Sequence, residues 1–158
     1  MNRIFIAILV PFSLCQASGG SSGEDTSTVN KAQLAEEVRS EFMRAWNAYK
    51  KYAWSHDGLK SLSKSHYDWY STSFLMTPVD ALDTMILMGF EDEADSTREY
   101  IAKHLSFDQD VYVKNFEFTI RLLGGLLSSY QLTNDKRLLD LAKDLGDRLL
   151  PAFKSPTG

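Results

Sequence analysis

The sequence has 158 residues, of which 44% are hydrophobic and 24% are charged, as is ordinary for a globular protein with one core. The formal net charge is −4 and no run of lysine or arginine occurs, so the chain lacks the basic surface that nucleic-acid binding requires. No P-loop, dinucleotide-binding glycine motif or nucleophile-elbow serine occurs, so the sequence gives no support for those classes of function.

The first 17 residues have the composition of a signal peptide. Arg3 supplies positive charge, residues 4–10 form an apolar run, and Cys15-Gln16-Ala17 offers a small-residue cleavage site. Because the apolar run is too short to span a bilayer comfortably, we expect export to the periplasm or the exterior. The alternative is an uncleaved anchor in a secretory-pathway membrane. Cleavage after Ala17 would remove Cys15, the one cysteine, and packing or a metal would then hold the chain together.

A Gly/Ser-rich linker at 18–30 separates this segment from the folded part, which we place at 31–158. Apolar residues recur there at helical intervals, and no strand-like alternation of convincing length is present. The expected helices span 31–54, 78–89, 92–105, 113–132 and a last segment from Asn134 or Asp135 to about Phe153, with an irregular loop at 55–77. The sequence therefore predicts an all-α fold of successive helical hairpins.

Capping signals set the expected boundaries of the second helix. Thr77 suits the N-cap, Pro78 suits the first helical position, and Asp80 lies where the acid of a capping box is found. Gly89 is expected to end this helix, because glycine favours the position after the last helical turn.

The second and fourth helices are unusually apolar for a small bundle. A helix that is apolar on every side needs neighbours on every side, and five helices can hardly supply them. We therefore expect residues 31–158 to be the first part of a larger helical barrel.

The fourth helix contains an isolated pair of charges. Glu117 and Arg121 are the only charged residues of the segment 116–133, and their spacing places them on one helix face, which Gly124 and Ser128 continue. Burying such charges is unfavourable unless they pair or serve a function. Each of the two adjacent glycines costs about 1 kcal/mol relative to alanine, which predicts the close approach of a neighbour. Two interpretations stay open: a structural ion pair with glycine-mediated packing, or a site with Glu117 as a general acid.

Two carboxylates share one face of the second helix. Asp80 and Asp83 are three residues apart, so their side chains project from neighbouring turns. Capping can explain Asp80. Asp83 lies between apolar residues in the middle of the helix, where a lone carboxylate is unfavourable without a partner or a function.

The loop expected at 55–77 also contains polar and aromatic residues. Its candidate metal ligands, His56, Asp57, His66 and Asp68, match no zinc-binding spacing. The neighbouring aromatic residues, among them Trp69, are typical either of a core or of a sugar-binding platform.

Four segments of the chain carry a resemblance to a known family. They are AWNAYKKYAWSHDGLKSLSK (45–64), PVDALDTMILMG (78–89), FEFTIRLLGGLLSSYQLT (116–133) and LAKDLGDRLLPAFKSPTG (141–158). Together they resemble the class I α-mannosidases, glycoside hydrolase family 47, from about Phe42 to the C-terminus. The DALDT and FE-x-x-IR-x-LGGLLS runs are the most specific of these motifs.

The resemblance implies an (α/α)7 barrel and an exo-acting, inverting α-1,2-mannosidase that removes terminal mannose from high-mannose glycans. It also implies a calcium ion in the floor of the site. By its motif, Glu117 corresponds to the proposed proton donor, and Arg121 to an arginine that lines the sugar site. Asp83 and Asp80 correspond to the acidic pair near the pocket, and we interpret His56 and Asp57 as structural. The substrate would be a high-mannose oligosaccharide or glycoprotein, with no nucleic acid and no membrane contact beyond the N-terminal segment.

The resemblance also implies that residues 31–158 are an incomplete catalytic domain. The family's other catalytic carboxylates and its calcium-binding threonine correspond to positions beyond these residues, so no metal ligand is assigned in this chain. We therefore expect the 158 residues alone to be inactive. The alternative function is that of a truncated or non-catalytic relative that binds mannose glycans without cleaving them.

Overall fold

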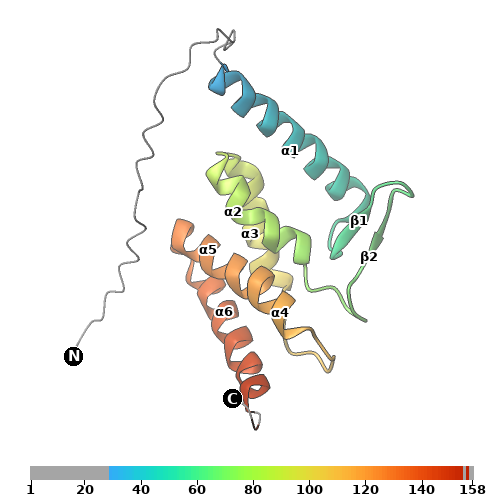
Figure 1. The fold of residues 1–158 in the computed structure, drawn as a ribbon, viewed down its shortest axis with the longest axis vertical. Coiled ribbons are helices and arrows are strands. Elements are labelled where there is room, and N and C mark those ends of the chain that lie inside the picture. The colour runs from blue at the N-terminus through green and yellow to red at the C-terminus, as the bar shows by residue number, and fades with distance from the viewer. Residues whose placement is uncertain (1–28, 155, 157–158) are drawn as a thin grey trace, which may run out of the picture. The chain divides into compact units, whose positions relative to one another are not determined.

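The structure, a computed structural model, describes residues 29–154 and 156, so the expected signal peptide and residues 18–28 of the expected linker lie outside the described residues (Figure 1). The folded unit is Ala32–Gly158. The elements are α1 (Lys31–Ala53), β1 (Gly58–Lys60), β2 (Ser65–Tyr67), α2 (Met76–Leu87), α3 (Glu91–His104), α4 (Asn115–Glu117), a π-helical segment (Phe118–Leu123), α5 (Gly124–Thr133), α6 (Lys136–Leu149) and a 3₁₀ turn (Leu150–Phe153). The expected helices are all present, which confirms the all-α prediction. No helix among residues 29–154 has the length and apolar composition needed to cross a membrane.

The segment expected to be an irregular loop contains a short antiparallel hairpin, so the prediction of an irregular loop was wrong for residues 58–67. Gly58 pairs with Tyr67, and Lys60 pairs with Ser65. Each strand has three residues, too few for an alternating pattern to be recognised in the sequence. A Cβ at Gly58 would overlap the ring of Tyr67, which explains the glycine.

The start of α2 differs from the predicted capping box. The helix begins at Met76, and its N-cap is Leu75, whose φ of 54° is left-handed. The Thr77 hydroxyl donates to the carbonyl oxygen of Asp57 at 2.6 Å, and the Asp57 carboxylate accepts from the Met76 N–H at 3.1 Å. The predicted N-cap role of Thr77 and capping role of Asp80 were therefore wrong, because a residue from the preceding loop replaces the local cap.

The end of α2 agrees closely with the prediction. The last helical residue is Leu87, and Gly89 follows with a φ of 71°. The N–H of Gly89 donates to the Ile86 carbonyl oxygen at 3.0 Å, and the N–H of Phe90 donates to that of Met85 at 3.0 Å. These bonds satisfy carbonyl groups that the end of the helix leaves without partners, and glycine adopts the left-handed conformation without strain.

Helix α2 packs against α3, the π-helical segment and α5, and α5 packs in turn against α6 (Figure 1). Three side chains of α2, those of Val79, Leu82 and Met85, are at most 1% exposed. The apolar side chains of the other helices that are 0% exposed are Ile101, Leu122, Leu126 and Leu138. Burying side chains of this size stabilises a fold by about 1.5–3 kcal/mol each, so these helices share one core.

Helix α1 joins the core through aromatic and charged contacts with α3. The ring of Trp54 lies 4.7 Å from that of Tyr100. The indole N–H of Trp46 donates to Glu93 at 2.9 Å, and the ammonium of Lys50 contacts the other oxygen of the same carboxylate at 2.6 Å. A single acid of α3 therefore holds two consecutive turns of α1.

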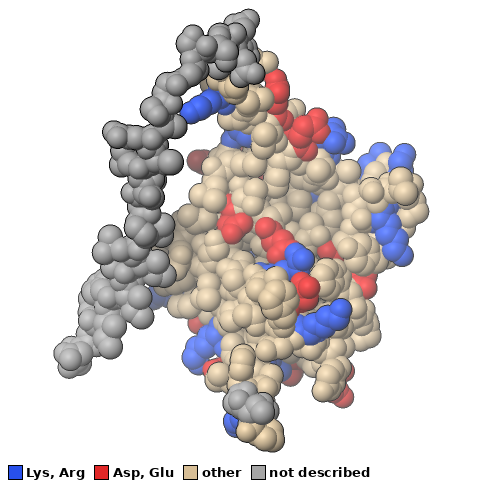
Figure 2. Space-filling model, viewed as in Figure 1, with Lys and Arg blue, Asp and Glu red and all other residues tan. Residues whose placement is uncertain are grey.

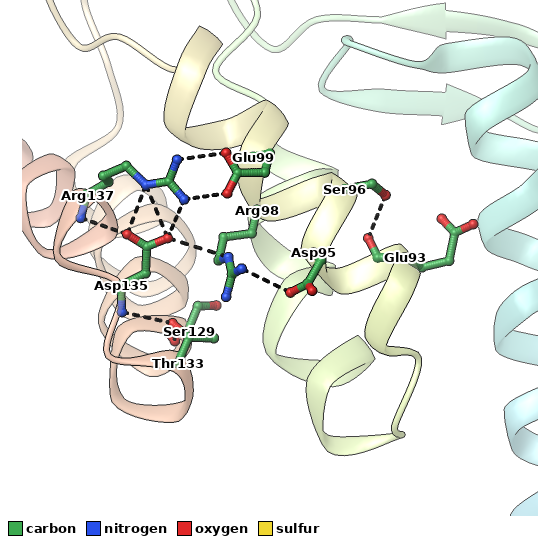
Figure 3. A network of polar contacts seen from close by, with 9 residues as sticks. All are labelled: Glu93, Asp95, Ser96, Arg98, Glu99, Ser129, Thr133, Asp135 and Arg137. Carbon is green, nitrogen blue, oxygen red and sulfur yellow. Dashed lines mark hydrogen bonds and ion pairs between the residues drawn. The ribbon is translucent and has the colours of Figure 1, made fainter.

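A charged network links α3 to the start of α6 (Figure 3). The N-cap of α6 is Asp135, whose carboxylate accepts from the Arg137 N–H at 3.0 Å. The guanidinium of Arg137 bonds both Asp135 and Glu99, and Arg98 of α3 lies between Asp95 at 3.0 Å and Asp135 at 3.4 Å. The network thus joins the start of α6 to α3, with the Asp135 carboxylate as the shared partner of both arginines.

Several apolar side chains of α2 and of the helix that follows α3 are not covered within the described residues. Leu87 is 74% exposed, Phe116 is 69% exposed and Ile120 is 51% exposed. These residues account for the apolar composition that the sequence showed all round the two helices. They lie on faces that the described elements leave open to solvent.

Gly125 provides the close helix contact that the sequence predicted, whereas Gly124 does not. A Cβ at Gly125 would lie 2.9 Å from Cγ1 and 3.1 Å from the carbonyl oxygen of Val79 on α2. A Cβ at Gly124 would find its nearest contact at 3.6 Å, which is an ordinary distance. The close packing of α5 against α2 therefore requires glycine at position 125 but not at position 124.

This difference predicts opposite effects of the same substitution. Gly124→Ala should raise the free energy of unfolding by up to about 1 kcal/mol, since alanine favours the helix and meets no obstacle. Gly125→Ala should lower it by about 1 kcal/mol, because the clash outweighs the same helical gain. Urea denaturation followed by circular dichroism measures both, and equal effects of the two variants would contradict the assignment.

Candidate functional site

The candidate site lies on the helix 115–133, which consists of α4, the π-helical segment and α5 without a break in helical backbone conformation. The sequence predicted this helix but not its π-helical middle. π-helical turns occur mostly as insertions within α-helices and are frequent at functional sites. The segment Phe118–Leu123 contains Arg121 and directly follows Glu117, so it determines where both side chains project.

Arg121 joins the predicted acids of two helices. Its Nε donates to Glu117 Oε2 at 2.8 Å, as the spacing predicted, and its Nη1 donates to Asp80 Oδ2 on α2 at 2.8 Å. Figure 2 shows acidic side chains gathered around basic ones at the centre of the visible face, over the region that α2 and α4 occupy in Figure 1. The side chains of Arg121, Glu117 and Asp80 are 36%, 24% and 34% exposed, so solvent reaches all three.

Asp83 lies one turn further along α2 and has its own partner. Its Oδ2 accepts from the Ser128 hydroxyl of α5 at 2.8 Å, and its Oδ1 accepts from Thr84 at 3.3 Å. The four predicted residues therefore lie along the contact between α2 and the helix 115–133. Only Glu117, Arg121 and Asp80 are joined by direct bonds, and Asp83 is paired with Ser128 instead.

Trp69, for which the sequence left a core position or a sugar-binding platform open, is a neighbour of the site. The Arg121 guanidinium carbon lies 5.2 Å from the centre of the Trp69 ring, a distance at which a cation and an aromatic face attract each other. The ring is partly exposed. Its place in a loop, 52 positions before Arg121, left no periodic pattern in the sequence that could have revealed the contact.

The charges of the cluster influence one another. Burial raises the pKa of Asp80 above its ordinary value, against the opposing hydrogen bond and charge of Arg121, while Asp83 and Glu117 raise it further. The hydrogen bonds that Arg121 donates to Glu117 and then to Asp80 raise the pKa of Arg121, so the guanidinium remains charged. The cluster thus holds two carboxyl groups around one fixed cation, an arrangement suited to binding hydroxyl groups and to orienting an acid.

The other loop residues that the sequence singled out lie around the hairpin. His56 Nδ1 lies 2.9 Å from Asp68 Oδ2, and the rings of His56 and His66 stack with their centres 3.5 Å apart. Asp57 is 1% exposed, and its carboxylate accepts hydrogen bonds from backbone N–H groups.

The described residues do not form a site that fits a calcium ion. Calcium takes six to eight oxygen ligands, and carboxylates usually supply several of them. No group of three or more His, Cys, Asp or Glu side chains among residues 29–154 is placed to hold a metal ion. No chemical step through a metal is therefore derived from these residues.

The opposing influences on Asp80 can be measured. We expect a carboxyl titration followed by NMR to give Asp80 a pKa above that of an ordinary aspartate, because burial disfavours its charge. Arg121→Gln should raise that pKa further, since it removes the group that opposes burial. Arg148→Gln, which removes an arginine paired with Asp144 instead, is the control and should leave Asp80 unchanged. An Asp80 pKa that is unchanged by Arg121→Gln would show that Arg121 does not oppose the effect of burial on Asp80.

Comparison with known proteins places the chain in a family. The model of glycosyl hydrolase family 47 matches residues 41–158. A human endoplasmic reticulum mannosyl-oligosaccharide 1,2-alpha-mannosidase is 47% identical over 116 residues, which are 73% of this chain and 16% of that protein. A mannosyl-oligosaccharide 1,2-alpha-mannosidase of Arabidopsis thaliana is 39% identical over 150 residues, which are 90% of this chain and 27% of that protein.

A solved structure agrees with the sequence comparisons. The alpha-1,2-mannosidase from Trichoderma reesei matches with a TM-score of 0.70 and 33% identity over 79% of this chain and 29% of its own. The chain thus spans less than a third of the length of each of these relatives, and its helices correspond to part of an (α/α)7 barrel. With the family model covering most of its length, this chain belongs to glycosyl hydrolase family 47.

Proposed function

We propose that the chain is part of an exported α-1,2-mannosidase that removes terminal mannose from high-mannose glycans with inversion. The observation that carries this proposal is the bridge from Glu117 through Arg121 to Asp80, at 2.8 Å on both sides. The bridge lies within the family match, on a face that solvent reaches. A glycosidase requires carboxyl groups that are held in place and open to substrate, and these residues satisfy both conditions.

Glu117 is the acid of the proposed reaction. An inverting glycosidase uses one carboxyl group to protonate the leaving oxygen, directly or through a relay, and another to activate water on the opposite face of the sugar. The bond to Arg121 engages Oε2 of Glu117 and leaves Oε1 without a protein partner in the described part of the chain. Arg121 therefore fixes the rotamer of the acid, and Oε1 remains available for proton transfer.

Asp80, Asp83 and Arg121 are the proposed sugar-binding residues. The carboxylate oxygens can accept from sugar hydroxyls, and the guanidinium can donate to them. The carboxyl group that activates water is assigned to none of the described residues. In the proposal it belongs to the remainder of a complete domain.

The proposal also includes a calcium ion and export. The calcium rests on the family resemblance alone, and its ligands would come from outside residues 29–154. When bound, such an ion would supply a fixed positive charge for sugar hydroxyls. The signal-peptide composition of residues 1–17 supports export, with a signal anchor in a secretory-pathway membrane as the alternative.

Removing the acid tests the assignment of Glu117. In a complete family 47 domain that contains this segment, Glu117→Gln should lower kcat by about 100-fold to 10,000-fold, since general acid catalysis contributes that much. Release of mannose from an α-1,2-linked high-mannose glycan, with calcium present, measures the effect. Glu41→Gln, on an exposed turn of α1, is the matched control and should stay near wild-type activity. Activity of the Glu117 variant within a few-fold of wild type would show that Glu117 is not the acid.

The chain itself provides a second test. Residues 18–158 should give no turnover of α-1,2-mannobiose with calcium, because the reaction needs a second carboxyl group that we assign to none of the residues here. Equilibrium binding of the same disaccharide, followed by NMR shifts at Arg121 and Trp69, separates binding from hydrolysis. Turnover comparable to that of a complete domain would contradict the proposal, whereas binding by a complete domain without turnover would favour the glycan-binding alternative.

A further inference from the structure

Asp57 is a buried carboxylate that receives hydrogen bonds almost entirely from backbone. Its Oδ1 accepts from the N–H of Phe74 at 2.7 Å, the N–H of Met76 at 3.1 Å and the hydroxyl of Ser73 at 3.1 Å. Its Oδ2 accepts from the N–H of Trp69 at 3.0 Å. No ion pair to Asp57 is formed within residues 29–154, because the nearby His56 pairs with Asp68. Burying a carboxylate without a cation is unfavourable, so the four hydrogen bonds must offset the loss of its hydration.

The two oxygens of this carboxylate hold different parts of the molecule. Oδ1 gathers the residues before and at the start of α2, where Leu75 adopts its left-handed conformation. Oδ2 holds only the backbone of Trp69, and the ring of Trp69 covers the Arg121 guanidinium. One oxygen therefore supports the helix that carries Asp80, and the other supports the aromatic face of the candidate site.

We propose that Asp57 is a positioning residue of the candidate site, which holds Trp69 against Arg121 through its Oδ2. Through Arg121 it sets the placement of Glu117 and Asp80. This inference rests on the proposed function only for the catalytic role of the cluster. The contact between Asp57 and Trp69 and its effect on Arg121 can be tested without activity. A purely structural role in the loop would need Oδ1 alone, because three of the four donors converge there.

The substitution Asp57→Asn separates the two oxygens. An amide has one oxygen acceptor and one NH₂ donor. The lowest-cost orientation points the oxygen at the three donors before α2, which leaves the NH₂ facing the N–H of Trp69. The variant should therefore keep the start of α2 and lose the bond to Trp69. Ser73→Ala is the matched control, since it removes one donor from Oδ1 and the acceptor of the Leu75 N–H but leaves Oδ2 untouched.

The readout is the Nε–H resonance of Arg121 in the full chain, which the ring current of Trp69 shifts. Trp69→Ala gives the position of that resonance without the ring. In Asp57→Asn we expect the resonance to move at least half of the way to this position, while the amide hydrogens of Phe74 and Met76 still exchange slowly. In Ser73→Ala the resonance should stay at its wild-type position.

Two results would overturn the proposal. One is an Asp57→Asn chain that folds and keeps the wild-type Arg121 resonance, because Trp69 would then need no tether. The other is an equal displacement of the resonance in Ser73→Ala, because the effect would then belong to the loop as a whole. Both measurements use the wild-type Glu117 and need no turnover, so a failure of the proposed function is distinguishable from a failure of this one.

The wild-type chain decides the question if Asp57→Asn does not fold. In wild type, we expect increasing urea to remove the protection of the Trp69 amide from hydrogen exchange. The ring-current shift of the Arg121 resonance should disappear at the same urea concentration. Opening of the Trp69 amide well before any change at Arg121 would overturn the proposal, because the stack would then persist without the tether.

Discussion

The close contact of Gly125 with Val79 is the constraint around which the two most apolar helices are arranged. Helices α2 and α5 approach closely at Gly125, where no side chain fits against Val79. At the edge of this contact the helices bring Asp80, Glu117 and Arg121 within hydrogen-bonding distance. An acid from one helix and an acid from the other would repel without the cation between them. Apolar packing therefore fixes the distance between the helices, and Arg121 makes that distance electrostatically acceptable.

The loop before α2 connects this arrangement to the rest of the fold. Leu75 adopts a left-handed conformation that costs about 1–2 kcal/mol in a residue other than glycine. Its two neighbours, Phe74 and Met76, both donate to the buried carboxylate of Asp57. Hydrogen bonds to a charged acceptor stabilise by about 1.5–3 kcal/mol each, which is enough to hold the strained residue. Because Asp57 directly precedes β1, its bonds to Met76 and Thr77 also join the hairpin to α2, which a local cap at Thr77 would not do.

The parts of the fold that follow from local patterns could be predicted, and the parts set by distant contacts could not. Apolar periodicity located all five helices, and the Glu117–Arg121 spacing predicted their bond. The capping box at Thr77 and Asp80 was wrong because Asp57 and Arg121, both remote along the chain, take the places of local partners. The π-helical segment and the contact between Trp69 and Arg121 depend on packing between elements, so no local pattern contains them.

The degree of exposure distinguishes the two interpretations that the sequence left open for Glu117 and Arg121. An ion pair that solvent reaches contributes at most about 1 kcal/mol, since water and salt screen it and two long side chains lose freedom. The stability of these helices therefore does not depend on the pair, because apolar residues around it form the core. The chain instead keeps three charged side chains in contact, with an aromatic ring over the cation. Structural cost without matching stabilisation is typical of residues held in place for binding or chemistry, which favours a functional site over a structural ion pair.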